Sequence, residues 1–136
     1  MATVRYVDYE DAGLIVRQVY DDIMATRKTD WVNNFWKALA NHPELLRRTW
    51  EGVKEVMSPG ALDALTKEMI YIAVSSTNGC DYCINSHTAS ARNKGMTSAM
   101  LTELMAVIGM ANQTNSLANG LQVEVDSAFL GGGQHL

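Results

Sequence analysis

Apolar residues recur at the three- and four-residue spacing of an α-helix along nearly the whole chain, and only two prolines interrupt the pattern. This spacing predicts amphipathic helices rather than strands, whose side chains would alternate between two faces. Apolar faces on successive helices must be buried against one another. The sequence therefore predicts an all-α fold, a bundle of about six to seven helices.

Turn and capping residues divide the amino-terminal part into three predicted helices. The first covers about residues 9–27, and Thr29-Asp30 then caps a short second helix. Asn41 is expected to cap a third, with Pro43 in its first turn, where a missing amide proton costs nothing. Ser58-Pro59-Gly60 ends this helix. We expect the core to include the three tryptophans, Trp31, Trp36 and Trp50.

The carboxyl-terminal part contains a fourth predicted helix over about residues 61–77, which becomes apolar almost all round after Glu68. Asn78-Gly79 supplies residue types that tolerate a left-handed helix end. A fifth helix then runs to Lys94-Gly95, and Thr97 or Ser98 starts a sixth.

The helical pattern weakens after Asn112, where we expect the sixth helix to give way to a separate last helix. Gly131-Gly132-Gly133 predicts a flexible tail over residues 131–136. Since no domain linker interrupts the rest, we expect one domain over residues 1–130, a length that can bury its own core.

The charge balance argues against several partners. Fifteen acidic residues outnumber eleven basic ones, giving a formal net charge of -4. This charge offers no basic field for nucleic acid or anionic lipid. No apolar run reaches the ~18 residues of a membrane span, and the amino terminus lacks an apolar signal core. We therefore expect a cytoplasmic protein with no nucleic-acid or membrane partner.

The only two cysteines are Cys80 and Cys83, in the motif Cys-Asp-Tyr-Cys directly after Asn78-Gly79. In a reducing compartment a close pair of this kind is more often catalytic or metal-binding than a structural bridge. Within a helix, residues three apart have Cβ atoms ~5–6 Å apart, whereas a disulfide needs ~3.5–4.5 Å. A helix start is thus where the pair can close. Cys83 falls in the first turn, where unpaired amides acidify a thiol.

His87 and Glu68 are the candidate acid–base partners of the thiols. His87 lies four residues after Cys83 and therefore on the same helix face, where it can accept or relay the Cys83 proton. Glu68 lies twelve residues before Cys80, and the short turn folds its helix back so that its carboxylate can face His87. We expect a carboxylate–imidazole–thiol relay in which partial burial favours the neutral form of Glu68.

This pattern of Glu68, Cys80, Cys83 and His87 resembles the signature of the alkylhydroperoxidase D and carboxymuconolactone decarboxylase family, which is all-helical. The similarity covers about residues 62–105, and the stretch around Asn41 to Leu45 is also similar. The resemblance implies a peroxidase or disulfide oxidoreductase: Cys83 would become a sulfenic acid, and Cys80 would donate a proton and resolve it. Glu68 and His87 would form the proton relay.

The same resemblance implies a homo-oligomer, a trimer or hexamer, with no bound cofactor and no metal. An external dithiol, lipoyl or thioredoxin-like, would reduce the protein after it has acted on a hydroperoxide or disulfide. Tyr82 stands where the hydroperoxidase itself has a histidine between the cysteines, and the chain is too short for that protein's doubled architecture. Tyr82 would therefore either orient Cys80 as an auxiliary residue or merely pack.

Three alternatives remain open. Two thiolates, one imidazole and one carboxylate add up to four zinc ligands, so the constellation also suits a zinc-binding protein. A noncatalytic redox sensor would use the same dithiol. A carboxymuconolactone decarboxylase-type enzyme is the third alternative, although lactone chemistry has no need of two thiols.

Overall fold

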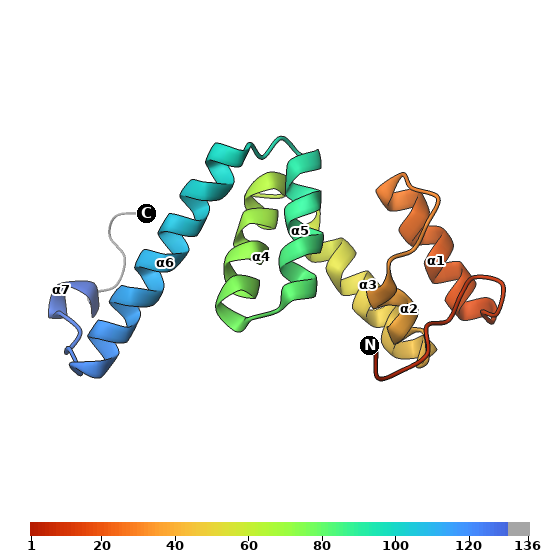
Figure 1. The fold of residues 1–136 in the computed structure, drawn as a ribbon, viewed down its shortest axis with the longest axis horizontal. Helices are drawn as coiled ribbons and strands as arrows, with labels where there is room; N and C mark the ends of the chain where they lie inside the picture. Colours follow the sequence, from red (N-terminus) through yellow and green to blue (C-terminus); the bar gives the residue numbers. More distant parts are fainter. Residues whose placement is uncertain (131–136) are drawn as a thin grey trace. The chain divides into compact units, whose positions relative to one another are not determined.

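The computed structural model describes residues 1–130, which form seven α-helices and contain no β-strand (Figure 1). The all-α prediction is confirmed. The helices belong to two compact units, Met1–Ser58 and a second unit that begins at Pro59. The expectation of one domain over residues 1–130 stays a prediction, and the predicted tail, residues 131–136, lies outside the described residues.

The first unit contains α1 (Leu14–Arg27), α2 (Asn34–Leu39) and α3 (Pro43–Met57). Helix α1 begins five residues later than predicted, because the chain before it is held outside the helix. The Val7 amide donates to the Lys37 carbonyl at 3.1 Å, and the Val7 carbonyl accepts from the Tyr20 hydroxyl at 2.7 Å. Residues 9–13 are then needed to turn the chain into α1.

Helix α3 begins at Pro43 as predicted, but its cap is His42 rather than Asn41. The His42 Nδ1 atom accepts a hydrogen bond from the Leu45 amide at 3.1 Å. The Asn41 side chain instead donates to the carbonyls of Arg5 and Ala38. The asparagine therefore ties down the amino-terminal segment.

An aromatic core fills the first unit. Trp36 and Trp50 meet edge to face with ring centroids 5.4 Å apart, and Tyr20, Ile23 and Leu46 are fully buried around them. The expectation that Trp31 belongs to the core is wrong, since 63% of its surface is exposed. Trp31 precedes the Asn33 cap of α2, so the helix does not turn its side chain inward.

The second unit contains α4 (Ala64–Asn78), α5 (Asp81–Asn93), α6 (Ser98–Gly120) and α7 (Ser127–Leu130). Helix α4 starts at Ala64 because the Asp63 carboxylate caps it, accepting from the Thr66 amide at 2.7 Å. Gly79 ends α4 with φ of 68°, the left-handed conformation that the sequence predicted. The tight turn there lays α5 antiparallel beside α4 (Figure 1).

Helix α6 continues through Asn112 to Gly120, so the predicted break at Asn112 is wrong. The polar residues after Asn112 end the apolar stripe, but they contain no proline or glycine that would stop the backbone before Gly120. The later part of α6 therefore has no apolar stripe to bury, but the backbone remains helical. None of the residues of α6 is buried against the described part of the chain.

The core of the second unit is small. Ile72 and Ala91 are fully buried where α4 meets α5, and Met96 joins them from the loop before α6. Partly buried leucines and methionines surround this centre, namely Leu65, Met69, Met100, Leu101 and Leu104. Beside it lie two buried polar residues, Glu68 and Ser75, and both face the predicted site.

Candidate functional site

The candidate site lies between α4 and α5, inside the second unit. Glu68 and Ser75 are seven residues apart on α4 and therefore share one face. Cys83 and His87 share a face of α5 for the same reason, and the antiparallel packing of the two helices brings these faces together. The contact between Glu68 and His87 that the sequence predicted is confirmed: Glu68 Oε2 lies 2.7 Å from His87 Nδ1.

Glu68 is the centre of a hydrogen-bonded cluster. Besides His87, its other oxygen Oε1 accepts from the Ser90 hydroxyl at 2.7 Å and from the Lys94 ammonium at 3.0 Å. Lys94 also donates to the Ser90 hydroxyl at 2.7 Å. Only 5% of Glu68 is exposed, so three donors replace the water that this carboxylate would otherwise bind.

The expectation that burial makes Glu68 neutral is wrong. Burial by itself would raise the pKa of Glu68, but the hydrogen bonds from His87, Ser90 and Lys94 outweigh it and lower the pKa to about 2. Glu68 is therefore ionised near neutral pH and cannot exchange a proton there. Its carboxylate accepts from His87 Nδ1, which fixes the imidazole with the proton on that nitrogen.

Tyr71 holds the His87 imidazole on its face. The two rings stack with centroids 3.6 Å apart and planes 21° apart. The hydrogen bond to Glu68 thus restrains rotation of the imidazole within its plane, and the Tyr71 ring covers one of its faces. The Nε2 atom is left as the nitrogen that can exchange a proton with a substrate or a thiol.

Cys80 and Cys83 are both free thiols, partly buried and close together. Cys80 is the residue that caps α5, and its amide donates to the Ser75 carbonyl at 3.0 Å. Cys83 is the third residue of the helix. The pair therefore has the placement at a helix start that the sequence predicted.

The two thiols differ in pKa. Cys83 has the higher pKa, whereas the sequence predicted that its thiol would be acidified. The Cys83 thiol and backbone amide stabilise the Cys80 thiolate and lower the pKa of Cys80. Burial, together with the neighbouring Cys80, raises the pKa of Cys83 to about 11, although Ser75 acts against this. The expectation that Cys83 is the acidified thiol is wrong: the pKa of Cys80 is lowered and that of Cys83 is raised, so Cys80 is the more acidic of the two thiols.

Tyr82, the residue between the cysteines, has 42% of its surface exposed. It lies in the first turn of α5, and it is not among the residues that donate to Glu68. An auxiliary role for Tyr82 therefore stays a prediction.

Sequence reasoning missed four residues of this site, namely Tyr71, Ser75, Ser90 and Lys94. A signal for them was present in the spacing. Tyr71 and Ser75 follow Glu68 by three and seven residues, and Ser90 and Lys94 follow Cys83 by seven and eleven. These are the intervals that keep residues on one face of a helix, so extending the faces of Glu68 and Cys83 would have found all four.

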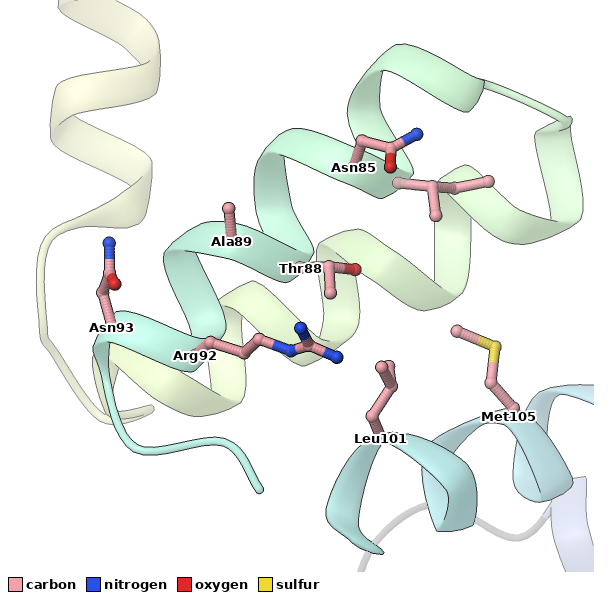
Figure 2. Close-up of a pocket in the computed structure, with 8 residues that line it drawn as sticks. Asn85, Thr88, Ala89, Arg92, Asn93, Leu101 and Met105 are labelled. Carbon is pink, nitrogen blue, oxygen red and sulfur yellow. The ribbon is translucent and has the colours of Figure 1, made fainter. Parts of the chain in front are cut away.

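A groove of about 530 Å³ runs along the neighbouring face of α5, towards α6 (Figure 2). It is lined by apolar and polar side chains, and Thr88, Arg92, Leu101 and Met105 point into it (Figure 2). Neither thiol, nor Glu68, nor His87 lines this groove. The reactive groups therefore lie outside this groove.

The described residues contain no cluster suited to a metal ion and no membrane span. Within residues 1–130, no group of three or more histidine, cysteine, aspartate or glutamate side chains is arranged to hold a metal ion. None of the helices in the same range has the length and apolar character needed to cross a membrane.

Comparison with known proteins finds a structural relative that matches nearly the full length of the chain. A crystal structure of an alkylhydroperoxidase AhpD core from Rhodospirillum rubrum superposes with a TM-score of 0.92 and is 59% identical, covering 96% of this chain and 98% of that one. Two curated relatives match in part. Uncharacterized protein 4 in the cox locus of Paracoccus denitrificans is 39% identical over 40% of this chain. Alkyl hydroperoxide reductase AhpD of Maricaulis maris is 37% identical over 49% of it.

The chain spans about half the length of the Paracoccus protein (49%) and about a third of the Maricaulis protein (36%). The profile of the carboxymuconolactone decarboxylase family matches residues 43–124, which include every residue of the site. Together with the all-helical fold and the match to an AhpD core, this shows that the chain is an AhpD-like member of the carboxymuconolactone decarboxylase family.

Proposed function

We propose that this protein is a thiol-dependent peroxidase that reduces organic hydroperoxides with the Cys80–Cys83 pair. The observation that carries the proposal is the free thiol pair at the start of α5, in which the pKa of Cys80 is lowered and that of Cys83 is raised. The proposal gains support from two relatives, the alkyl hydroperoxide reductase AhpD of Maricaulis and the alkylhydroperoxidase AhpD core of Rhodospirillum.

In the first step, the Cys83 proton passes through His87 Nε2 to the Cys80 thiolate, and the Cys83 sulfur attacks the terminal oxygen of the hydroperoxide. An S–O bond forms, the O–O bond breaks, and Cys83 becomes a sulfenic acid. The departing alkoxide takes the proton now on Cys80 and leaves as an alcohol. Cys83 is the better candidate for attack despite its higher pKa, because it shares a helix face with His87 whereas Cys80 lies at the cap.

In the second step, the Cys80 thiolate attacks the Cys83 sulfenic sulfur. A disulfide forms and hydroxide leaves, taking a proton from solvent to become water. The role proposed for Glu68 is to hold His87 in position rather than to carry protons, since its carboxylate stays ionised. An external dithiol, lipoyl or thioredoxin-like, then reduces the disulfide by exchange.

Disulfide reduction is a second candidate activity, and the Cys80 thiolate favours it. Thiol–disulfide exchange begins with attack by a thiolate, and the lowered pKa of Cys80 makes its thiol the easier of the two to ionise. Here Cys80 would attack an external disulfide, and Cys83 would release the product by attacking the mixed disulfide.

The peroxidase proposal is tested by mixing reduced protein with cumene hydroperoxide and following peroxide loss and thiol count together. We expect one peroxide consumed and both thiols lost per chain. Cys80→Ser should still react once and retain a sulfenic acid on Cys83, whereas Cys83→Ser should be inert towards peroxide. An intact thiol count would contradict the proposal, and reactivity of Cys83→Ser alone would reverse the two roles.

Three other functions are distinguished by simple assays. Turnover of a γ-carboxymuconolactone by protein with both cysteines changed to serine would favour a decarboxylase. Near-stoichiometric zinc that protects both thiols from alkylation would favour a zinc protein. Oxidation without turnover in the presence of excess dithiol would favour a sensor.

We also propose that the protein is a homo-oligomer, a trimer or hexamer. Helix α6 buries no residue within the described chain, and it exposes Val107, Met110 and Leu117. Large exposed apolar surfaces commonly mark interfaces. Sedimentation at micromolar concentration should give an oligomer, and a single monomeric species would contradict this proposal.

A further inference from the structure

Tyr71 belongs to the site, but the mechanism above gives it no chemical task. It lies three residues after Glu68 on α4, and its ring stacks on His87 at 3.6 Å. Its phenol is also close enough to both cysteines for their negative charge to act on it. Tyr71 thus lies at the junction of the imidazole and the thiol pair.

The Tyr71 hydroxyl makes no hydrogen bond to another residue in the described range 1–130. The buried Tyr20 hydroxyl, by contrast, donates to the Val7 carbonyl at 2.7 Å. A partly buried phenol beside reactive groups can therefore donate a hydrogen bond to an oxygen atom of a bound ligand. Burial, then the negative charge of Cys83, Cys80 and Glu68, raises the pKa of Tyr71. The phenol therefore keeps its proton, and its ability to donate, throughout the neutral range.

We propose that the Tyr71 hydroxyl donates a hydrogen bond to the departing oxygen of a bound hydroperoxide. This inference rests on the proposed peroxidase function. As the Cys83 sulfur bonds to the terminal oxygen and the O–O bond breaks, negative charge develops on the oxygen that carries the organic group. A donor fixed at that position stabilises the charge before the proton from Cys80 arrives. No proton leaves Tyr71 in this step.

The inference makes Tyr71 a residue that distinguishes between substrates. A hydroperoxide offers an oxygen on which charge develops, whereas a disulfide offers only sulfur, a weak acceptor. Loss of the hydroxyl should therefore slow oxidation by peroxide and leave exchange with a disulfide nearly unchanged. A purely structural role for Tyr71 would affect both reactions equally.

The test compares Tyr71→Phe with wild type in two stopped-flow reactions of the reduced protein, one with cumene hydroperoxide and one with dithiodipyridine. Phenylalanine keeps the ring that stacks on His87 and removes only the hydroxyl. We expect the peroxide rate constant to fall about 10- to 100-fold, the effect of losing one hydrogen bond to a charged group. The disulfide rate should change less than about twofold. Tyr6→Phe, in the first unit, is the matched control and should leave both rates unchanged.

Equal rates of wild type and Tyr71→Phe with peroxide would overturn the inference, as would equal losses in both reactions. Should Tyr71→Phe fail to fold, 2,3-difluorotyrosine at position 71 keeps the shape and makes the phenol ionise at lower pH. The alkaline fall of the peroxide rate should then move to lower pH, and an unmoved profile would also overturn the inference. If wild type itself consumes no peroxide, the proposed function fails rather than the assignment of Tyr71.

Discussion

The two units of this chain use their interiors differently. The first buries aromatic and aliphatic side chains around Trp36 and Trp50 and has no charged residue in its core. The second has only three fully core residues, and places the buried carboxylate of Glu68 and the hydroxyl of Ser75 beside them. Burying polar groups costs free energy unless each is hydrogen-bonded. The second unit therefore has less apolar packing than the first, and its interior instead contains a hydrogen-bonded carboxylate.

This contrast indicates where each kind of residue acts. Changes in the first unit should alter stability and spare the thiol chemistry, because its core contains none of the site residues. Changes around Glu68 should alter chemistry first, because the cluster serves to orient one imidazole. Four substitutions and one change of pH test this division.

Glu68→Gln should slow oxidation of Cys83 by roughly 10²–10⁴-fold, the range for lost acid–base catalysis. Glutamine fills the same space, but it carries no charge and no longer fixes the proton on His87 Nδ1. The measurement is the stopped-flow rate with cumene hydroperoxide, accompanied by a circular dichroism spectrum. His87→Ala should impair the same step, and the double variant should be little worse than the poorer single one. Unchanged activity per folded molecule would make Glu68 a purely structural acid.

Trp36→Ala should destabilise the protein by about 3–5 kcal/mol, the usual cost of emptying a large aromatic site. Only 2% of Trp36 is exposed, and it contacts the Trp50 ring. Urea unfolding measures the loss. The folded fraction should react with peroxide at the wild-type rate, and a change in that rate would break the proposed division between the units.

Stability should fall in acid because of Glu68. Its pKa is lowered from 4.5 to about 2 in the folded chain, so its ionised form stabilises the fold above pH 4.5. That contribution is lost as the pH falls from about 4.5 towards 2. Urea unfolding at pH 5.5 and pH 3 should show a drop that is smaller in Glu68→Gln. An identical drop in both proteins would show that other groups cause the acid sensitivity.

Lys94→Gln should have the smallest effect, a loss of less than about fivefold in the peroxide rate. Its side chain is 36% exposed, and partly exposed ion pairs contribute at most about 1 kcal/mol. Glutamine can still donate to Ser90, and His87 and Ser90 still hold Glu68. A loss comparable to that of Glu68→Gln would mean that Lys94 is essential to the cluster.

Much of the fold followed from local sequence signals. Pro43 and Gly79 mark helix ends by their backbone conformations and Thr97 marks one by its side-chain cap, and the structure uses all three. The start of α1 and the length of α6 were predicted wrongly because neither depends on a local signal. Residues 9–13 are kept out of α1 by hydrogen bonds that join Val7 to Lys37 and Tyr20, which are distant in the sequence. Helix α6 continues beyond the end of its apolar stripe.

The sequence predicted which residues form the centre of the site, but it did not predict their protonation and pKa values. The spacing of Glu68 and His87 was enough to predict their contact, since two helices joined by a tight turn must pack together. The ionised state of Glu68 depends on Ser90 and Lys94, which lie on a different helix and donate to it only once the two helices are packed. Likewise, the lowered pKa of Cys80 depends on hydrogen bonds from Cys83, which a first-turn argument applied to Cys83 alone could not predict.

Whether Cys80 and Cys83 react as one redox pair can be decided by intact-protein mass spectrometry. Reduced protein is treated with one equivalent of cumene hydroperoxide, quenched in acid and weighed without added thiol. We predict a mass lower by two hydrogen atoms and no site left for alkylation. An unchanged mass with both thiols alkylated, or a stable gain of oxygen with Cys80 still free, would contradict the pairing.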